Sequence, residues 1–167
     1  MIPLNIKHEK LILEQELHNL FSVLRLATET DLPTGIDAQL NTLRKLRAEV
    51  YEDLNQLQHK ALIIKAAELF QTEHPEINCW YWHPKQTSHP DEPDLSGFEN
   101  EKIMISVEVT SSERPVGTTD QHMARTLNSL SRKKGILYYC VQSQKMLARA
   151  NSKVNKNQLG IIVRLIP

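Results

Sequence analysis

The spacing of the apolar residues first changes at His74-Pro75, and this change restricts the fold more than any other feature. Before it, leucines recur at spacings of three and four, as between Leu13 and Leu24, which predicts helix. After it, short aromatic or β-branched runs and strict apolar–polar alternation predict strands. The sequence therefore predicts a helical N-terminal part followed by a mixed α/β part.

A second helix is predicted from Ile36 to about Glu73, after a break at Pro33 and Gly35. Thr34 and Asp37 have the spacing of a capping box at its start. Its apolar seam has heptad spacing, with Arg47 as the polar interruption: Ile36, Leu40, Leu43, Val50, Leu54, Leu57, Ala61 and Ile64. Such a helix is long, so two shorter helices, a plain hairpin packed on the main body and a hairpin that also dimerises all stay open. We expect a helical hairpin arm over residues 1–56 and an α/β domain over residues 57–167.

In the α/β part, each strand and helix is predicted from its own local pattern. Alternation is clearest in Lys102–Thr110, where Glu108 lies on the polar side of the strand. Trp80 and Trp82 share one face of their strand, and we expect them in the core rather than stacked on nucleic-acid bases. The predicted strands are Ile77–Trp82, Lys102–Thr110, Ile136–Val141 and Gly160–Ile166, the helices are Asp120–Arg132 and Ser143–Lys156, and His83–Pro93 and Glu113–Thr118 are loops.

Positive charge is concentrated in the last third of the chain. The whole sequence has 20 basic and 20 acidic residues, but from Arg114 onward there are ten basic residues and a single acid, Asp120. This third therefore carries a net charge of +9 and the remainder carries −9. A basic region of this size suggests a surface that faces a polyanion, although a solvated helix face explains it equally well.

Composition excludes several classes of protein. Hydrophobic residues make up 40% of the chain, which is enough for a core, and no apolar run approaches the length of a membrane span. Two cysteines cannot form a disulfide scaffold, and five scattered glycines exclude a glycine-rich phosphate loop. We expect a soluble cytoplasmic protein without a membrane partner. Zinc receives little support, because the available residues fit no standard spacing: His74, Cys79, His83 and His89.

Two acids carry the strongest chemical signal. Asp94 follows Pro93 at the start of a hairpin, and Glu108 lies in an otherwise apolar strand, where an unpaired carboxylate is costly. Two carboxylates together with a backbone carbonyl, that of Val109, form an oxygen site suited to Mg²⁺ or Mn²⁺. Glu68, on the long helix before the first strand, is a candidate third carboxylate.

From about Leu57 to Pro167, the chain resembles the PD-(D/E)XK nuclease superfamily, which has the restriction-endonuclease-like fold. The matching residues are Glu68 on the helix, Pro93-Asp94, and Glu108-Val109-Thr110. The resemblance implies a mixed sheet flanked by helices, with the acids binding one or two Mg²⁺ ions for phosphodiester hydrolysis. It also implies that Gln121 and Arg125, on the next helix, face the active site.

Thr110 stands where this family has a lysine. Arg114 and Lys65 are the better substitutes, because Lys102 lies six residues, about 20 Å, from Glu108 along the strand. The hydroxyls and backbone of residues 110–117 could hold a phosphate or form a plain loop. We expect a metal-dependent nuclease that acts on DNA as a homodimer through its N-terminal helices. The residues expected to approach the DNA backbone are Arg114, Gln121, Arg125, Arg132, Lys133 and Lys134.

Two other functions stay open at this point. The first is a catalytically inactive nuclease-fold module that binds nucleic acid or serves as a protein adaptor, which the threonine at position 110 favours. The second is a coiled-coil interaction protein in which the α/β part is only a scaffold.

Overall fold

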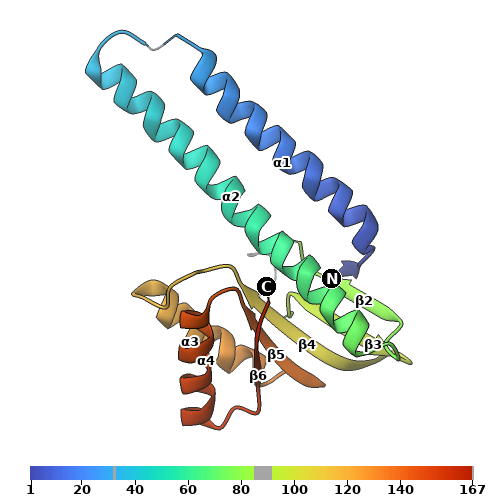
Figure 1. Ribbon diagram of the computed structural model, residues 1–167. Helices are drawn as coiled ribbons and strands as arrows, with labels where there is room; N and C mark the ends of the chain where they lie inside the picture. Colours follow the sequence, from blue (N-terminus) through green and yellow to red (C-terminus); the bar gives the residue numbers. More distant parts are fainter. Residues whose placement is uncertain (32, 85–91, 167) are drawn as a thin grey trace.

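A computed structural model describes residues 1–31, 33–84 and 92–166. Four helices and six strands occur in these ranges, and they form a mixed open sheet with two helices at the N-terminal side (Figure 1). Within them no helix is both long and apolar enough to cross a membrane. The elements in chain order are β1 (Ile2–Pro3), α1 (Ile6–Glu29), α2 (Ile36–Glu73), β2 (Cys79–Trp82), β3 (Leu95–Glu99), β4 (Lys102–Thr110), α3 (Thr118–Leu130), β5 (Ile136–Val141), α4 (Gln144–Asn157) and β6 (Ile162–Leu165).

The strands lie in the sheet in the same order as in the chain, from β1 to β6. β1 to β4 are antiparallel neighbours, whereas β5 and β6 run parallel to β4 and are reached through α3 and α4. The predicted α/β class with a preceding helical hairpin is confirmed. β4 and β5 have the bounds predicted from their patterns, and α3 and α4 begin and end within two residues of the predicted positions.

The N-terminal hairpin consists of α1 and α2, which run antiparallel and extend away from the sheet at their connected end (Figure 1). α2 is one continuous helix of 38 residues, so the alternative of two shorter helices is wrong. The predicted boundary between residues 56 and 57 falls inside α2, where its side chains begin to be buried. The predicted capping box is also wrong. The N-cap is Gly35, at φ +93°, and no side chain caps the helix, because the chain enters it one residue later than Thr34.

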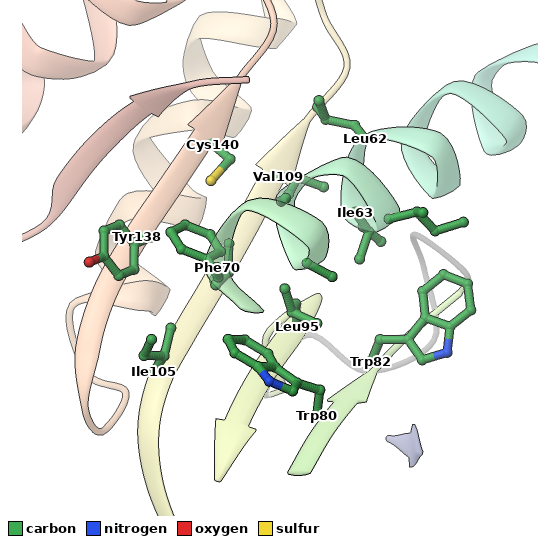
Figure 2. Close-up of a cluster of buried hydrophobic side chains, with 14 of the residues drawn as sticks. Leu62, Ile63, Phe70, Trp80, Trp82, Leu95, Ile105, Val109, Tyr138 and Cys140 are labelled. Carbon is green, nitrogen blue, oxygen red and sulfur yellow. The ribbon is translucent and has the colours of Figure 1, made fainter. Parts of the chain in front are cut away.

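The inner half of α2 covers one face of the sheet (Figure 2). Its Leu62, Ile63 and Phe70 form one buried cluster with residues of β2 to β5. Trp80 and Trp82 belong to this cluster, so their prediction as core residues is confirmed. A second cluster fills the opposite face, where α3 and α4 pack on β5 and β6. The sheet is thus covered on both faces in its parallel part, as parallel strands require.

The alternation in β4 assigns its side chains to these two faces. Ile105, Val107 and Val109 belong to the cluster beneath α2, whereas Glu108 lines a cavity together with residues of α3. Gly135 precedes β5 at φ +84°, and a Cβ atom there would lie 2.4 Å from the Met104 carbonyl oxygen. Only glycine therefore lets β5 start this close to β4.

Candidate active site

The two predicted acids meet where β3 begins and β4 ends. Asp94 directly precedes β3, whose first residue, Leu95, is paired with Val107 of β4. The backbone N–H of Val109 donates to Asp94 Oδ2 at 2.8 Å, and the side chains of Asp94 and Glu108 share a hydrogen bond. Antiparallel pairing thus brings together two carboxyl groups that are fourteen residues apart in the chain.

The Asp94–Glu108 pair is short of positive charge. Burial of the half-buried Glu108, followed by the negative charge of Asp94 and their shared hydrogen bond, raises the pKa of Glu108 from its ordinary 4.5 to about 9. The ammonium group of Lys133 opposes this rise in pKa, but its effect is the smallest of the four. The protein alone therefore keeps Glu108 protonated near neutral pH, and a cation bound between the acids would displace that proton.

His59, on α2, completes this cluster. Its side chain is only 1% exposed, and its Nε2 lies 3.3 Å from Asp94 Oδ1. Neither ring nitrogen has a hydrogen-bond partner among the described residues. Because a buried polar group without a partner is costly, the site has an orphaned nitrogen ligand beside two carboxyl groups.

His59 was missed from the sequence, and Glu68 was predicted in its place. The structure puts Glu68 elsewhere: it is paired with Lys10 of α1 at 2.5 Å and does not line the cavity. A signal for His59 was present, because it shares the spacing of the apolar face formed by Ile63, Ala66 and Phe70. A histidine on the buried face of a helix was the better candidate than an acid on a half-exposed face.

A polar cavity of about 400 Å³ opens over this cluster. Hydroxyl groups from the loop after β4 and from α3 make up much of its wall. Besides His59, Asp94 and Glu108, the titratable side chains among its lining residues are His122, on α3, and Tyr139, on β5. The Oγ1 of Thr126 lies 3.3 Å from His122 Nδ1. The lining residues are His59, Asp94, Glu108, Val109, Thr110, Ser112, Thr118, Thr119, His122, Met123, Thr126 and Tyr139.

Thr110 lies in the cavity but is already engaged. Its side chain hydrogen-bonds to the phenol of Tyr139, whose pKa is raised chiefly by burial. Val109 has a buried side chain and donates its backbone N–H to Asp94 Oδ2. Both residues therefore lie beside the acids, as predicted, but Thr110 does not supply the positive charge that the family's lysine provides.

Most of the predicted nucleic-acid contacts lie outside this cavity. Gln121 and Arg125 are exposed on α3, but the side chains of that helix that face the cavity are one position further on, His122 and Thr126. Arg114 lines a separate polar groove of about 570 Å³, formed with Gln58, Glu113, Gln142, Ser143, Gln144 and Lys145. Arg132 and Lys134 are exposed after α3.

The other candidates for the missing lysine lie at a distance from the acids. Lys65 is exposed on α2 and does not line the cavity, and Lys102 starts β4 at the end away from Glu108. Lys133, predicted only as a DNA contact, is the basic residue whose charge reaches Glu108. Its position follows from the turn between α3 and β5, which the sequence does not specify.

The part of the chain that the structure describes contains no ready-made metal centre. Among residues 1–31, 33–84 and 92–166, no three His, Cys, Asp or Glu side chains are already placed to hold an ion. The weak zinc set is dispersed: His74 contacts Glu76 and Tyr138, His83 contacts Glu92, and Cys79 is exposed. His89 lies outside the described residues.

Comparison of the chain with family models, with curated proteins and with solved structures finds no match. The chemistry of the cavity itself is therefore what indicates a function.

Proposed function

We propose that the protein is a metal-dependent nuclease that hydrolyses phosphodiester bonds in DNA. One observation carries the proposal: Asp94 and Glu108 share a cavity with the orphaned nitrogens of His59, and burial together with mutual repulsion disfavours their double negative charge. A divalent cation is the ligand that relieves both problems at once, since it supplies positive charge and a partner for the imidazole.

The order and pairing of the elements support a restriction-endonuclease-like core. A helix is followed by three antiparallel strands, a second helix and then a strand parallel to the third, and Asp94 and Glu108 lie on the last hairpin of the three. This arrangement fits the mixed sheet flanked by helices that the PD-(D/E)XK resemblance implies, with His59 in place of the acid on the first helix.

The residues that would hold Mg²⁺ or Mn²⁺ are Asp94, Glu108 and His59. Two carboxylates suit either ion, and the imidazole nitrogen suits Mn²⁺ better than Mg²⁺. When bound, such an ion lowers the pKa of a water molecule and stabilises negative charge on the phosphate. Among the groups that the chain supplies, the hydroxyls of Ser112, Thr118 and Thr119 can donate hydrogen bonds to phosphate oxygens in the same cavity.

His122 is the residue best placed to move a proton in this cavity. Thr126 contacts Nδ1 and so orients the ring, while Nε2 can accept a proton from the attacking water. Basic residues of the last third of the chain would then hold the DNA backbone outside the cavity, including Arg114, Arg125, Arg132 and Lys134.

Nicking of supercoiled plasmid in the presence of Mn²⁺ tests this function. The wild type should convert supercoiled to open-circular DNA, EDTA should stop the reaction, and Glu108→Gln should nick at least about 100-fold more slowly. Glu101→Gln, at the opposite end of the β3–β4 hairpin, is the matched control and should keep full activity. Nicking that persists in EDTA or in Glu108→Gln contradicts the proposal.

A DNA-binding module that does not cut is the second candidate. The hydrogen bond between Thr110 and Tyr139 favours it, because the position of the catalytic lysine is then taken by a neutral side chain committed to the core. Such a protein should shift DNA in a gel equally well with EDTA or with Mn²⁺, and it should nick with neither. The proposed nuclease is distinguished by the nicking alone.

A further inference from the structure

The hairpin arm leaves an unusual amount of apolar surface uncovered. Thirteen large apolar side chains are exposed among the described residues, and nine of them belong to α1 and to α2 before residue 55. Consistent with this exposure, α2 has no buried residue before Leu57. The arm therefore needs an explanation other than the fold of a single chain, since exposed apolar patches of this kind mark interaction sites.

These side chains are not scattered over α2. Ile36, Leu40, Leu43 and Leu54 lie on one side of α2 together with Arg47, whereas Val50, the other position of this heptad seam, lies at the edge of that side. Their face differs from the one that meets α1. That second face contains Leu46, Val50 and Leu57, which are more buried and share the spacing of Lys60, whose Nζ pairs with Glu16 of α1 at 2.8 Å.

α1 contributes Phe21 to the same surface. Glu16 pairs with Lys60, so Phe21, five residues further towards the tip, lies at the level of Asn55, next to Leu54. In two antiparallel helices, the residue that comes directly after a packed position points to the same side of the pair in both helices. Phe21 comes directly after the packed Leu20 of α1, and Arg47 comes directly after the packed Leu46 of α2. Phe21 therefore lies on the same side as Arg47. Leu26 is equally exposed but lies about 140° round α1 from Phe21, on another side.

The size of this surface fits a second copy of the chain. Its six large side chains, Phe21, Ile36, Leu40, Leu43, Tyr51 and Leu54, are between 39% and 76% exposed. At roughly 200 Å² for a fully exposed side chain of this size, they present about 700 Å² per copy. Two copies would bury about 1,400 Å², which is within the range of a specific, stable interface. We propose that two copies pair through this surface, which we call the arm face.

Charge favours an antiparallel pairing. Arg47 lies within the arm face, between Leu43 and Leu54, whereas the acids Glu49, Glu52 and Asp53 lie on other sides of α2. Parallel helices would set Arg47 beside Arg47 of the partner subunit, and this like-charge contact is unfavourable. A two-fold axis between residues 48 and 49 instead brings Leu43 to the level of Leu54 of the partner subunit.

Sedimentation equilibrium of the full chain at micromolar concentration tests the arm face. The wild type should have twice the monomer mass, and Leu43→Glu/Leu54→Glu should raise the dimer dissociation constant at least about 100-fold, because charges would be buried at the centre of the interface. Leu26→Glu is the matched control and should remain dimeric. Fluorescence of the buried Trp80 and Trp82 should be unchanged in all three, which shows that the sheet stays folded.

Single cysteines test the orientation in a Cys79→Ser background, which removes the exposed native thiol and leaves the buried Cys140. Leu43→Cys and Leu54→Cys should form disulfides when mixed, and neither should do so efficiently alone. A monomeric wild type, a dimer that survives Leu43→Glu/Leu54→Glu, or one lost in Leu26→Glu overturns the proposal. Crosslinking of each variant with itself overturns the antiparallel pairing. None of these outcomes depends on nuclease activity.

Discussion

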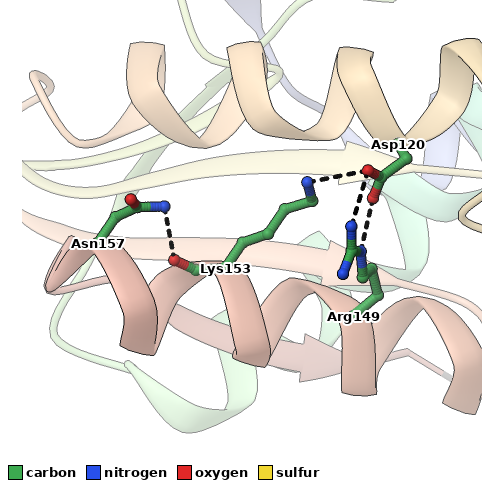
Figure 3. Close-up of polar contacts among 4 residues, drawn as sticks. All are labelled: Asp120, Arg149, Lys153 and Asn157. Atoms are coloured by element: carbon green, nitrogen blue, oxygen red, sulfur yellow. Dashed lines mark hydrogen bonds and ion pairs between the residues drawn. The ribbon is translucent and has the colours of Figure 1, made fainter.

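Two acidic centres of the molecule, Asp120 and the Asp94–Glu108 pair, differ in how much positive charge the chain places beside them. Asp120, in the first turn of α3, receives hydrogen bonds from two residues of α4 (Figure 3). The Arg149 guanidinium donates to both carboxylate oxygens, at 2.7 and 3.0 Å, and Lys153 Nζ lies 3.1 Å from Oδ2. These hydrogen bonds, Arg149 first, hold the pKa of Asp120 well below its ordinary value of 3.8. The chain thus neutralises this acid with its own residues.

At the other centre, Asp94 and Glu108 lie against each other, and the pKa of Glu108 moves up rather than down. The positive charges that surround Asp120 have no equivalent of the same strength here, since Lys133 has only a small effect on Glu108. An acid paired within the fold is structural, whereas a pair that repels in a polar cavity has the character of a binding site. The contrast suggests that the missing charge comes from outside the chain.

Removing one acid from each centre and measuring the nicking rate tests the difference between the two centres most strongly. Asp94→Asn should slow Mn²⁺-dependent nicking at least about 100-fold, because several kcal/mol of charge stabilisation are lost. Asp120→Asn should leave the rate unchanged, since Asp120 does not line the cavity. Equal rates for wild type and Asp94→Asn would remove the functional distinction between the centres.

Stability should also respond to pH in a way that identifies Glu108. The pKa of Glu108 in the folded protein lies above 4.5. Its contribution to the free energy of unfolding is therefore fully present below pH 4.5 and is lost as pH rises towards about 9. In EDTA, Glu108→Gln should therefore gain stability relative to wild type by up to about 1.4 kcal/mol per pH unit between about pH 5.5 and 7.5. Urea unfolding at the two pH values measures this. A difference that does not grow with pH would show that Glu108 is not held protonated.

His59→Leu separates stability from metal binding. Removing an unpartnered buried imidazole should stabilise the metal-free protein by about 1–3 kcal/mol in urea unfolding. The same variant should lose the stabilisation that Mn²⁺ gives to wild type. A loss of stability in EDTA would mean that the contact between His59 and Asp94 is itself a favourable part of the fold.

The smallest effect is expected at Asp120. Asp120→Asn should lower the midpoint of thermal unfolding slightly near pH 7, because an exposed ion pair contributes little. The difference should vanish in high salt, and it should shrink as pH falls below 3.8 towards the depressed pKa of Asp120 in the folded protein. A large effect that salt does not change would assign Asp120 a role beyond pairing α3 with α4.

Periodicity predicted most of the elements, because it records which side of each element is covered. The alternation of β4 gave its bounds and set Glu108 on the face opposite Ile105 and Val107. β3 and β1 had no such signal. β3 is five residues long, with Ser96 and Gly97 inside it, and β1 is only Ile2–Pro3. Both exist because β2 and β4 offer them hydrogen-bonding edges, which is information from elsewhere in the chain.

The candidate site was predicted in part for a similar reason. Asp94 and Glu108 could be found because a hairpin brings its two ends together locally. His59 and His122 come from helices whose rotation about their own axes is fixed by packing against the sheet. An error of one position on α3 exchanges His122 for Gln121, since consecutive residues are 100° apart. α2 also shows that a sequence pattern does not reveal what covers a helix. One heptad pattern runs through its outer half, which has no buried residues, and continues into its inner half, which lies in the core.

Calorimetric titration of Mn²⁺ into the metal-free protein tests most directly whether Asp94 and Glu108 form a cation site. Wild type and Asp120→Asn should bind with the same affinity, whereas Glu108→Gln should lose binding at least about 10-fold, because the ion loses one of its carboxylate ligands. Binding that disappears in Glu108→Gln alone establishes the difference between the two acidic centres. Absence of binding to wild type, or equal binding to Glu108→Gln, contradicts it.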